Sequence, residues 1–410
     1  MKKIMLTNKM PVLVMEDPDS PVATLDVWVN TGSALEPKDI NGVSHFLEHM
    51  IFKGTELRGA GEVDREIESV GGLWNAGTSI EFTHYYLTVG TPFVNTGIDV
   101  LSDVIANSKL DPLELERERQ VILEEYHRQQ DNPAHFLMTE AWSLSFEKSP
   151  NRWPVLGVPK TINAITREKL HKYYTSRYTP ENMVLVIAGG VRVEDIKPVL
   201  EEKFGSINRP FRKPRAGGEK TIRTHGLYRE FEKPIRESYI LFTFPAPDLG
   251  RPKDVYSFDL LSYILGEGRS SRLYRRIKED KRLVSSISAS YPTHRRDSLF
   301  YIFATFDYSK KQKVIDSVTR ELNRIFSSRV SGKELEKAKR LLTNHYLFSN
   351  ETTGGRTSET GFYYTLTGDT RFERNYLKKI GEVTAEDIRK VAGKFLKPEK
   401  ANIFIVKPEE

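Results

Sequence analysis

The stretch TREKLHKYYTSRYTPENMVLVI at Thr166–Ile187 recurs, in altered form, as TAEDIRKVAGKFLKPEKANIFI at Thr384–Ile405. The two segments align without a gap at an offset of 218 residues, which sets Pro180 over Pro398. In each copy a charged segment with helical spacing precedes the proline, and an apolar, strand-like segment follows it. A repeat of this kind indicates that one structural unit is used twice along the chain.

Two further pairs of segments support the repeat. ELERERQVILEEY from Glu114 matches ELEKAKRLLTNHY from Glu334 as a charged amphipathic helix, and Val43–Thr55 matches Ser257–Ser270 more loosely. The alternation of apolar and polar residues in PVATLDVWVNTGS, from Pro21, predicts a half-buried strand. Each unit therefore mixes strands with long helices. We predict an α+β fold of two homologous domains, each a largely antiparallel sheet packed with helices.

Length and composition agree with two domains joined by a linker. The 410 residues exceed what one hydrophobic core usually supports. Between the repeats, Ser206–Thr224 combines prolines, glycines and many charges with little apolar content, which is typical of an interdomain linker. We place the first domain at residues 1–207, the linker at 208–225 and the second domain at 226–410.

Composition also excludes several classes of function. The chain has no cysteine, so disulfides, thiolate metal sites and a cysteine nucleophile are all excluded. It has no apolar run of roughly 18 residues and no apolar signal core near its start, so we expect no membrane span and a cytoplasmic location. The net charge of +6 raises the question of nucleic-acid binding, but 56 acidic residues are interleaved with 62 basic ones. Such mixing is typical of a solvated surface, and we expect no nucleic-acid partner.

The segment NGVSHFLEHMIFKGT, from Asn41, contains an HxxEH motif at His45, Glu48 and His49. Its apolar residues have the spacing of a helix stripe that faces a core: Val43, Phe46, Leu47, Met50 and Ile51. Residues three and four apart are neighbours on a helix, so both imidazoles can bind one metal ion. Zinc commonly binds two imidazoles and one carboxylate and keeps a fourth coordination position for water. Glu48 can accept a proton from that water. The alternative is a polar helix face with two solvated or core histidines.

The third ligand must come from another segment. The helix predicted at about Asp111–Gln129 is the richest source of acids: Glu114, Glu116, Glu118, Glu124 and Glu125. Glu118 and Glu125 share one helical face, so both can point inward, but helix phase alone does not exclude Glu124. We expect most of the other acids to form a solvated face.

Four segments in this order resemble the pitrilysin family of zinc peptidases, the inverzincins named for HxxEH. They are HFLEHMIFKGT from His45, GGLWNAGTSIEFTHYY from Gly71, ERERQVILEE from Glu116 and GEGRSSRLYRRI from Gly266. The resemblance covers nearly the whole chain. Within the family, the chain is similar to the two-domain branch that includes the mitochondrial processing peptidase β subunit and its bacterial relatives.

The resemblance implies one Zn²⁺ per chain, bound by His45, His49 and Glu125. It implies that Glu48 is the general base and that Glu118 orients a metal ligand without binding the metal itself. In the family the substrate is held as an added strand on a sheet edge, which here implies five residues: Trp74, Asn75, Ala76, Gly77 and Thr78. Such main-chain pairing implies unfolded peptides as substrates.

The second half departs from the family pattern. Members that act alone carry an arginine and a tyrosine seven residues apart, and the alignment puts Lys278 and Ser285 at those positions. A shifted alignment would use other residues nearby: Arg276, Arg282 and Tyr291. The second half also has no HxxEH, with three different residues over that motif: Asp259, Ser262 and Tyr263. We therefore expect a single metal site, in the first domain.

These observations predict a zinc metalloendopeptidase that is the catalytic subunit of a dimeric clamshell. Its partner would be a homologous two-domain chain that supplies the missing pair, or a second copy of itself. The alternative is a non-catalytic scaffold or assembly subunit of the same family.

Overall fold

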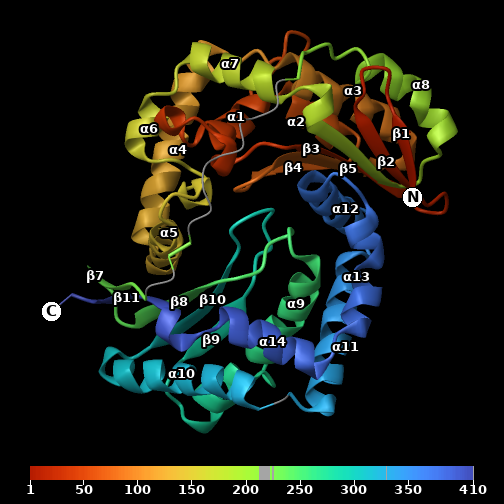
Figure 1. Cartoon of the computed structure of the whole chain (residues 1–410). Coiled ribbons are helices and arrows are strands. Elements are labelled where there is room, and N and C mark those ends of the chain that lie inside the picture. The colour runs from red at the N-terminus through yellow and green to blue at the C-terminus, as the bar shows by residue number, and fades with distance from the viewer. Residues whose placement is uncertain (212–221, 224–225, 329, 410) are drawn as a thin grey trace. The chain divides into compact units, whose positions relative to one another are not determined.

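The computed structural model of the chain describes residues 1–211, 222–223, 226–328 and 330–409 (Figure 1). Most of the predicted linker at 208–225 lies outside the described residues. The chain divides into two compact units, each drawn from both halves of the sequence. The first unit contains Met1–Tyr126, Trp153–Gly217 and Leu347–Glu373, and the second contains His127–Arg152, Gly218–Tyr346 and Arg374–Glu410. Each unit packs helices on a sheet, so the predicted α+β fold class is confirmed.

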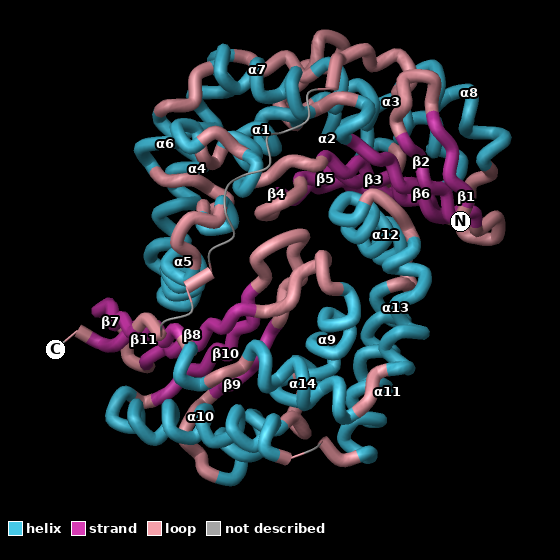
Figure 2. The backbone as a smooth tube through the Cα atoms, in the orientation of Figure 1, coloured by secondary structure: helices cyan, strands magenta, loops and turns pink. Residues whose placement is uncertain are grey.

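The first unit is built on a six-stranded sheet of order β1-β2-β6-β3-β5-β4. Its strands are β1 (Lys2–Met5), β2 (Pro11–Glu16), β3 (Val22–Val29), β4 (Leu73–Thr78), β5 (Thr83–Gly90) and β6 (Met183–Gly189). Neighbours are antiparallel except β2 and β6, and β4 forms one edge (Figure 2). The apolar side chains of one sheet face and of the covering helices form a single buried core.

The helices of the first unit include the two that the sequence predicted to carry the site. The α-helices of this unit are α1 (Val43–Ile51), α2 (Glu62–Ser69), α3 (Val94–Asn107), α4 (Pro112–Asp131), α6 (Pro159–Asn163), α7 (Arg167–Arg177), α8 (Val193–Lys203) and α12 (Thr353–Thr367). The helix predicted in the segment from Asn41 is α1, and the one predicted at about Asp111–Gln129 is α4, which runs into the second unit. Among the described helices, none combines the length and apolar character that a membrane crossing requires.

The second unit repeats this plan with a five-stranded sheet of order β7-β11-β8-β10-β9. Its strands are β7 (Tyr228–Lys233), β8 (Ser238–Pro245), β9 (Ser286–Ser290), β10 (Leu299–Phe306) and β11 (Asn402–Pro408). The helices that lie wholly or mostly in it are α5 (Pro133–Ser145), α9 (Pro252–Gly266), α10 (Lys311–Ser327), α11 (Gly332–Ser349), α13 (Arg371–Glu382) and α14 (Ala385–Phe395).

The quoted repeat corresponds to α7 with β6 and to α14 with β11. Both helices begin at a capping threonine: Thr166 accepts a hydrogen bond from the backbone of Lys169, and Thr384 accepts one from Asp387. Both strands then enter equivalent places, because β6 lies between parallel β2 and antiparallel β3, and β11 between parallel β7 and antiparallel β8. The repeated sequence therefore produces a repeated topology.

Each half of the sequence contributes one helix to the other half's sheet. Helix α12 packs on β3 and β6 of the first unit, where Thr353 and Thr24 share a hydrogen bond of 2.8 Å (Figure 1). Helix α5 packs on β8 and β11 of the second unit, where Ser145 and Thr243 share one of 2.7 Å. Neither sheet is therefore covered by its own half of the chain alone.

Gly361 allows α12 to approach the sheet. A Cβ atom at this position would lie 2.1 Å from Nε1 of Trp28, whose side chain is 2% exposed. The indole is large and buried, so it cannot move aside without repacking its neighbours.

We expect Gly361→Ala to destabilise the chain by about 1–3 kcal/mol, because the added methyl group overpacks a buried contact. Denaturant unfolding followed by tryptophan fluorescence measures this. Gly354→Ala in the same helix is the matched control, since a Cβ there meets no atom within 4 Å. It should be neutral or stabilising, by up to about 1 kcal/mol. Equal stability of the two variants would contradict the assigned packing of α12.

Candidate metal centre

The start of α1 is determined by the residues before it. Gly42 has φ 96°, a left-handed conformation, and a Cβ there would lie 2.4 Å from the Leu156 carbonyl oxygen. The Glu36 carboxylate accepts hydrogen bonds from the backbone N–H groups of Gly42, at 2.7 Å, and Ser44, at 2.8 Å. Burial raises the pKa of Glu36, and these hydrogen bonds oppose the rise. These contacts fix the residue at which α1 begins. They therefore also fix the direction in which His45, Glu48 and His49 point from the helix.

Two imidazoles of α1 meet a carboxylate of α4. The apolar stripe of α1 is buried in the core as expected: Val43, Phe46, Leu47, Met50 and Ile51. Nε2 of His45 lies 3.6 Å from Oε2 of Glu125, and Nε2 of His49 lies 3.9 Å from the same oxygen. One ligand atom from each of the three residues lies within 4.8 Å of the others. The rest of the described chain contains no second group of this kind.

These three residues have the chemistry and spacing of a zinc site. Ligand atoms about 2.0–2.2 Å from a tetrahedral zinc ion lie roughly 3.3–3.5 Å from one another, close to the two measured separations. Burial, with a contribution from the charge of His49, lowers the pKa of His45 to about 3. The neutral imidazole is the form that binds a metal. His45, His49 and Glu125 could therefore hold a metal ion.

Glu118 orients one of the imidazoles. Its Oε2 lies 2.9 Å from Nδ1 of His49, and its Oε1 lies 2.7 Å from Nζ of Lys53. Burial raises the pKa of Glu118, but the hydrogen bonds from Lys53 and His49 outweigh it, so the pKa is below its usual value. An ionised Glu118 accepts a hydrogen bond from the Nδ1–H group of His49, which leaves Nε2 free to bind a metal. Within the described residues, Nδ1 of His45 has no such partner.

Glu48 lies beside the candidate ligands but is held by a strand. The Thr78 hydroxyl, at the end of β4, donates a hydrogen bond of 2.5 Å to its Oε2. Burial raises the pKa of Glu48, while the Thr78 hydrogen bond and the nearby His49 act in the opposite direction. A carboxyl group with a raised pKa is well suited to accept a proton and release it later.

The five residues predicted to bind substrate all lie on β4. Within the described sheet β4 pairs with β5 alone, so the backbone groups of its other edge can pair with an added strand. The indole of Trp74 contacts Phe52, with ring centroids 4.0 Å apart, and donates a hydrogen bond to Asp64. Trp74, Ala76 and Thr78 thus face the helices, whereas Asn75 and Gly77 lie on the opposite face.

The other acids of α4 have different surroundings. Glu114 and Glu116 form ion pairs with Arg117 and Arg119 of the same helix, and Glu124 is exposed. Of the three acids that helix phase left open, Glu118, Glu124 and Glu125, the structure places Glu125 beside Nε2 of both imidazoles and Glu118 beside Nδ1 of His49. The sequence reasoning missed Lys53 and Thr78 as partners of the site acids. Lys53 follows His49 by four residues, so helical spacing carried a signal for it.

The second unit has hydrogen bonds at the positions equivalent to the ligands. The two alignments set Asp259, Tyr263 and His345 over His45, His49 and Glu125. The Tyr263 hydroxyl lies 2.7 Å from Nδ1 of His345, and Tyr376 donates a hydrogen bond to Asp259.

The residues considered for the missing arginine and tyrosine pair also lie in the second unit. The ammonium group of Lys278 lies over the ring of Tyr274, 4.8 Å from its centroid, and Ser285 donates a backbone hydrogen bond to Thr305. Arg276 pairs with buried Glu321 at 2.6 Å. The Tyr291 hydroxyl donates a hydrogen bond to the carbonyl of Pro247, and Arg282 has φ 51°. The absence of the arginine and tyrosine pair stays a prediction.

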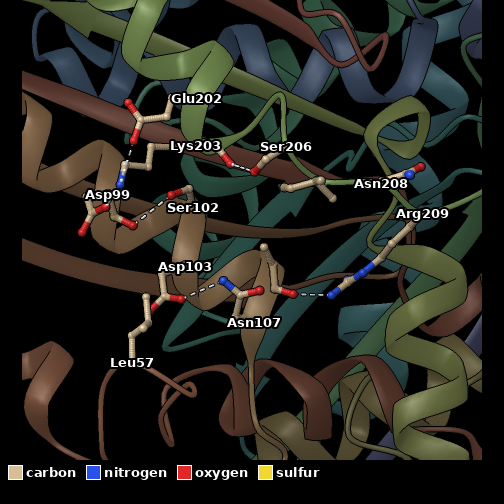
Figure 3. Close-up of a pocket in the computed structure, with 12 residues that line it drawn as sticks. Leu57, Asp99, Ser102, Asp103, Asn107, Glu202, Lys203, Ser206, Asn208 and Arg209 are labelled. Carbon is tan, nitrogen blue, oxygen red and sulfur yellow. Dashed lines mark hydrogen bonds and ion pairs between the residues drawn. The ribbon is translucent and has the colours of Figure 1, made fainter.

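A separate cavity of about 490 Å³ lies between α3 and the segment that follows α8 (Figure 3). Polar side chains that line it interact with one another: Asp99 lies 2.7 Å from Lys203, and Asp103 accepts a hydrogen bond from Asn107. The metal-centre residues are not among those that line it. The cavity is therefore a self-paired polar site distinct from the metal centre.

Relatives in sequence are named zinc proteases. The chain is 28% identical over 394 residues to the uncharacterized zinc protease YmxG of Bacillus subtilis, which covers 95% of this chain and 94% of the relative. It is 29% identical over 378 residues to the uncharacterized zinc protease SCO5738 of Streptomyces coelicolor. That alignment covers 90% of this chain and 82% of the relative.

Solved structures share the fold. A protease from Helicobacter pylori has a TM-score of 0.92 at 21% identity, covering 99% of each chain. A peptidase M16 inactive domain from Pseudomonas fluorescens has a TM-score of 0.89 at 17% identity, covering 100% of this chain and 98% of the other.

Two family models match successive parts of the sequence. The model described as insulinase (peptidase family M16) matches residues 11–154, which include the three candidate ligands. The model described as peptidase M16 inactive domain matches residues 164–342. The two matches in order, the relatives and the shared fold lead to one conclusion: the chain belongs to peptidase family M16.

Proposed function

We propose that the chain is a zinc metalloendopeptidase that hydrolyses unfolded peptides, with one Zn²⁺ held by His45, His49 and Glu125. One observation carries the proposal: two imidazole nitrogens and a carboxylate oxygen lie within 4.8 Å of one another, beside a buried Glu48 that is not among them. The names of the relatives support the same chemistry.

When bound, zinc would supply Lewis acidity, which polarises a carbonyl group and lowers the pKa of water. Glu48 is placed to accept a proton from the attacking water as the water oxygen bonds to the substrate carbonyl carbon. The same carboxyl then delivers the proton to the amine nitrogen as the C–N bond breaks. Thr78 holds Glu48 in place for both transfers, and Glu118 keeps Nε2 of His49 directed at the metal.

The outer edge of β4 would bind the peptide by main-chain hydrogen bonds. Because such pairing requires an extended backbone, it selects unfolded segments over folded proteins. Thr78 both ends this strand and contacts Glu48, so a peptide paired with β4 passes beside the general base.

We further propose that the active form is a dimer of two-domain chains. The partner would be a homologous chain that supplies the arginine and tyrosine missing at Lys278 and Ser285, or a second copy of this one. A non-catalytic scaffold subunit is the second candidate function, favoured by the match of residues 164–342 to an inactive-domain model.

The purified, zinc-loaded chain should hydrolyse quenched-fluorescence peptides and should lose this activity when a chelator removes the metal. The assay should be run beside a measurement of molar mass by light scattering, with a folded protein as the substrate control. Zinc binding without hydrolysis would contradict self-sufficient catalysis and favour the scaffold function or a subunit that needs its partner.

Glu48→Gln should lower kcat by about 10²–10⁴-fold and keep one zinc ion per chain, because it removes the proton acceptor and no ligand. Metal content by mass spectrometry and peptide hydrolysis measure the two effects. Glu124→Gln, an exposed acid of α4, is the matched control and should retain full activity. Undiminished hydrolysis by Glu48→Gln would refute its role as base.

His45→Ala should abolish stoichiometric zinc binding, because two ligands remain of three. Glu118→Gln should still bind zinc, but about 10–100-fold more weakly, because among the candidate ligands Glu118 contacts only His49. Titration with a competing chelator measures both affinities, and His171→Ala, at an exposed histidine of α7, is the control. Full zinc occupancy in His45→Ala would overturn the ligand assignment.

A further inference from the structure

The face of β4 and β5 that points away from α1 carries a histidine that the proposed mechanism does not use. His84 on β5 pairs across the sheet with Gly77 of β4, so both lie on this face. The His84 side chain is 17% exposed. Its Nδ1 lies 3.1 Å from Oδ1 of Asp26, a residue that is 1% exposed.

The imidazole is held in one orientation. Its ring stacks on Trp28, with centroids 4.3 Å apart and planes at 29°, and on Tyr86, at 5.4 Å and 21°. The buried Asp26 carboxylate requires a donor, so Nδ1 carries a proton and donates it. The remaining ring nitrogen, Nε2, has no hydrogen-bond partner within the described residues.

Gly77 leaves this nitrogen uncovered. A Cβ atom at position 77 would lie 3.3 Å from Nε2 and 3.5 Å from Cδ2 of His84, so a larger side chain would lie against that edge of the ring. Gly77 has no left-handed conformation that would require glycine. Because position 77 has no side chain, residue 77 does not cover this edge of the imidazole.

The open edge lies next to the proposed reaction centre. Gly77 directly precedes Thr78, whose hydroxyl donates to Glu48. A peptide added to the outer edge of β4 places the side chain opposite Gly77 on the same face as His84, because paired residues share a face. At about 3.3 Å per residue, that side chain lies within roughly two residues of the cleaved bond.

A carboxamide is the side chain that satisfies Nε2 in either protonation state. Unprotonated Nε2 accepts a hydrogen bond from the amide NH₂ group, and protonated Nε2 donates to the amide oxygen. A carboxylate can only accept and is repelled by Asp26, and an aliphatic side chain leaves Nε2 unpaired. We propose that His84, exposed by Gly77, selects asparagine or glutamine at this substrate position, an inference that rests on the proposed peptidase function.

The test is to map the cleavage sites that the zinc-loaded chain produces in a degenerate peptide library, by mass spectrometry. Wild type should favour Asn and Gln over Leu and Met by about 10-fold or more at one position within roughly two residues of the cut. His84→Phe keeps a ring between Trp28 and Tyr86 but removes both nitrogens, and should lose the preference at that position alone. His171→Phe, at an exposed histidine, is the control and should leave the profile unchanged.

Gly77→Ala provides an independent variant in case His84→Phe leaves Asp26 unpaired and fails to fold. Its methyl group covers the imidazole edge and should weaken the same preference. Cleavage without a carboxamide preference, or a preference that survives both substitutions, would overturn the inference and leave the peptidase function intact. A wild-type chain that cleaves no peptide by itself would remove both self-sufficient catalysis and this inference.

Discussion

The candidate metal centre depends on the hydrogen bond between Glu118 and His49, because this bond joins two helices across 69 positions of the sequence. Helix α1 presents two imidazoles, and the third candidate ligand, Glu125, comes from α4. Glu118 aligns α4 with α1 through His49 and Lys53, and Glu125, two turns further along α4, then lies at the imidazoles. Since Glu118 is buried, its charge requires both partners. The lysine is therefore part of the architecture of the site.

The site also requires that the proton-accepting group lie next to the strand that would bind substrate. The Thr78 hydroxyl connects the two. Thr78 is the last residue of the edge strand and the hydrogen-bond donor to Glu48. The strand that would pair with a peptide thus also positions the group that would move the proton. Its two faces have different surroundings: Trp74 and Ala76 pack toward the helices, while Gly77 exposes His84 on the other side.

The two units show how one topology can hold different chemistry. Their five equivalent strands have the same order, and each half of the chain contributes a helix to the other half's sheet. At the positions equivalent to the candidate ligands His49 and Glu125, however, the second unit has a hydrogen bond between Tyr263 and His345. The duplicated backbone is maintained by its apolar core, which tolerates such exchanges on a polar helix face.

The sequence by itself determined the features that depend on local spacing. The period of the apolar residues defined α1 and placed His45, Glu48 and His49 on its other face, and the repeat at Thr166 and Thr384 predicted two α+β units. Only the tertiary structure decided the features that depend on where distant segments meet. It distinguished Glu125 from Glu124, brought α12 against Trp28, and paired Asp26 with His84. The physical reason is that helix and strand periods are properties of neighbouring residues. Contacts between elements instead depend on the packing of the whole core, which no single segment encodes.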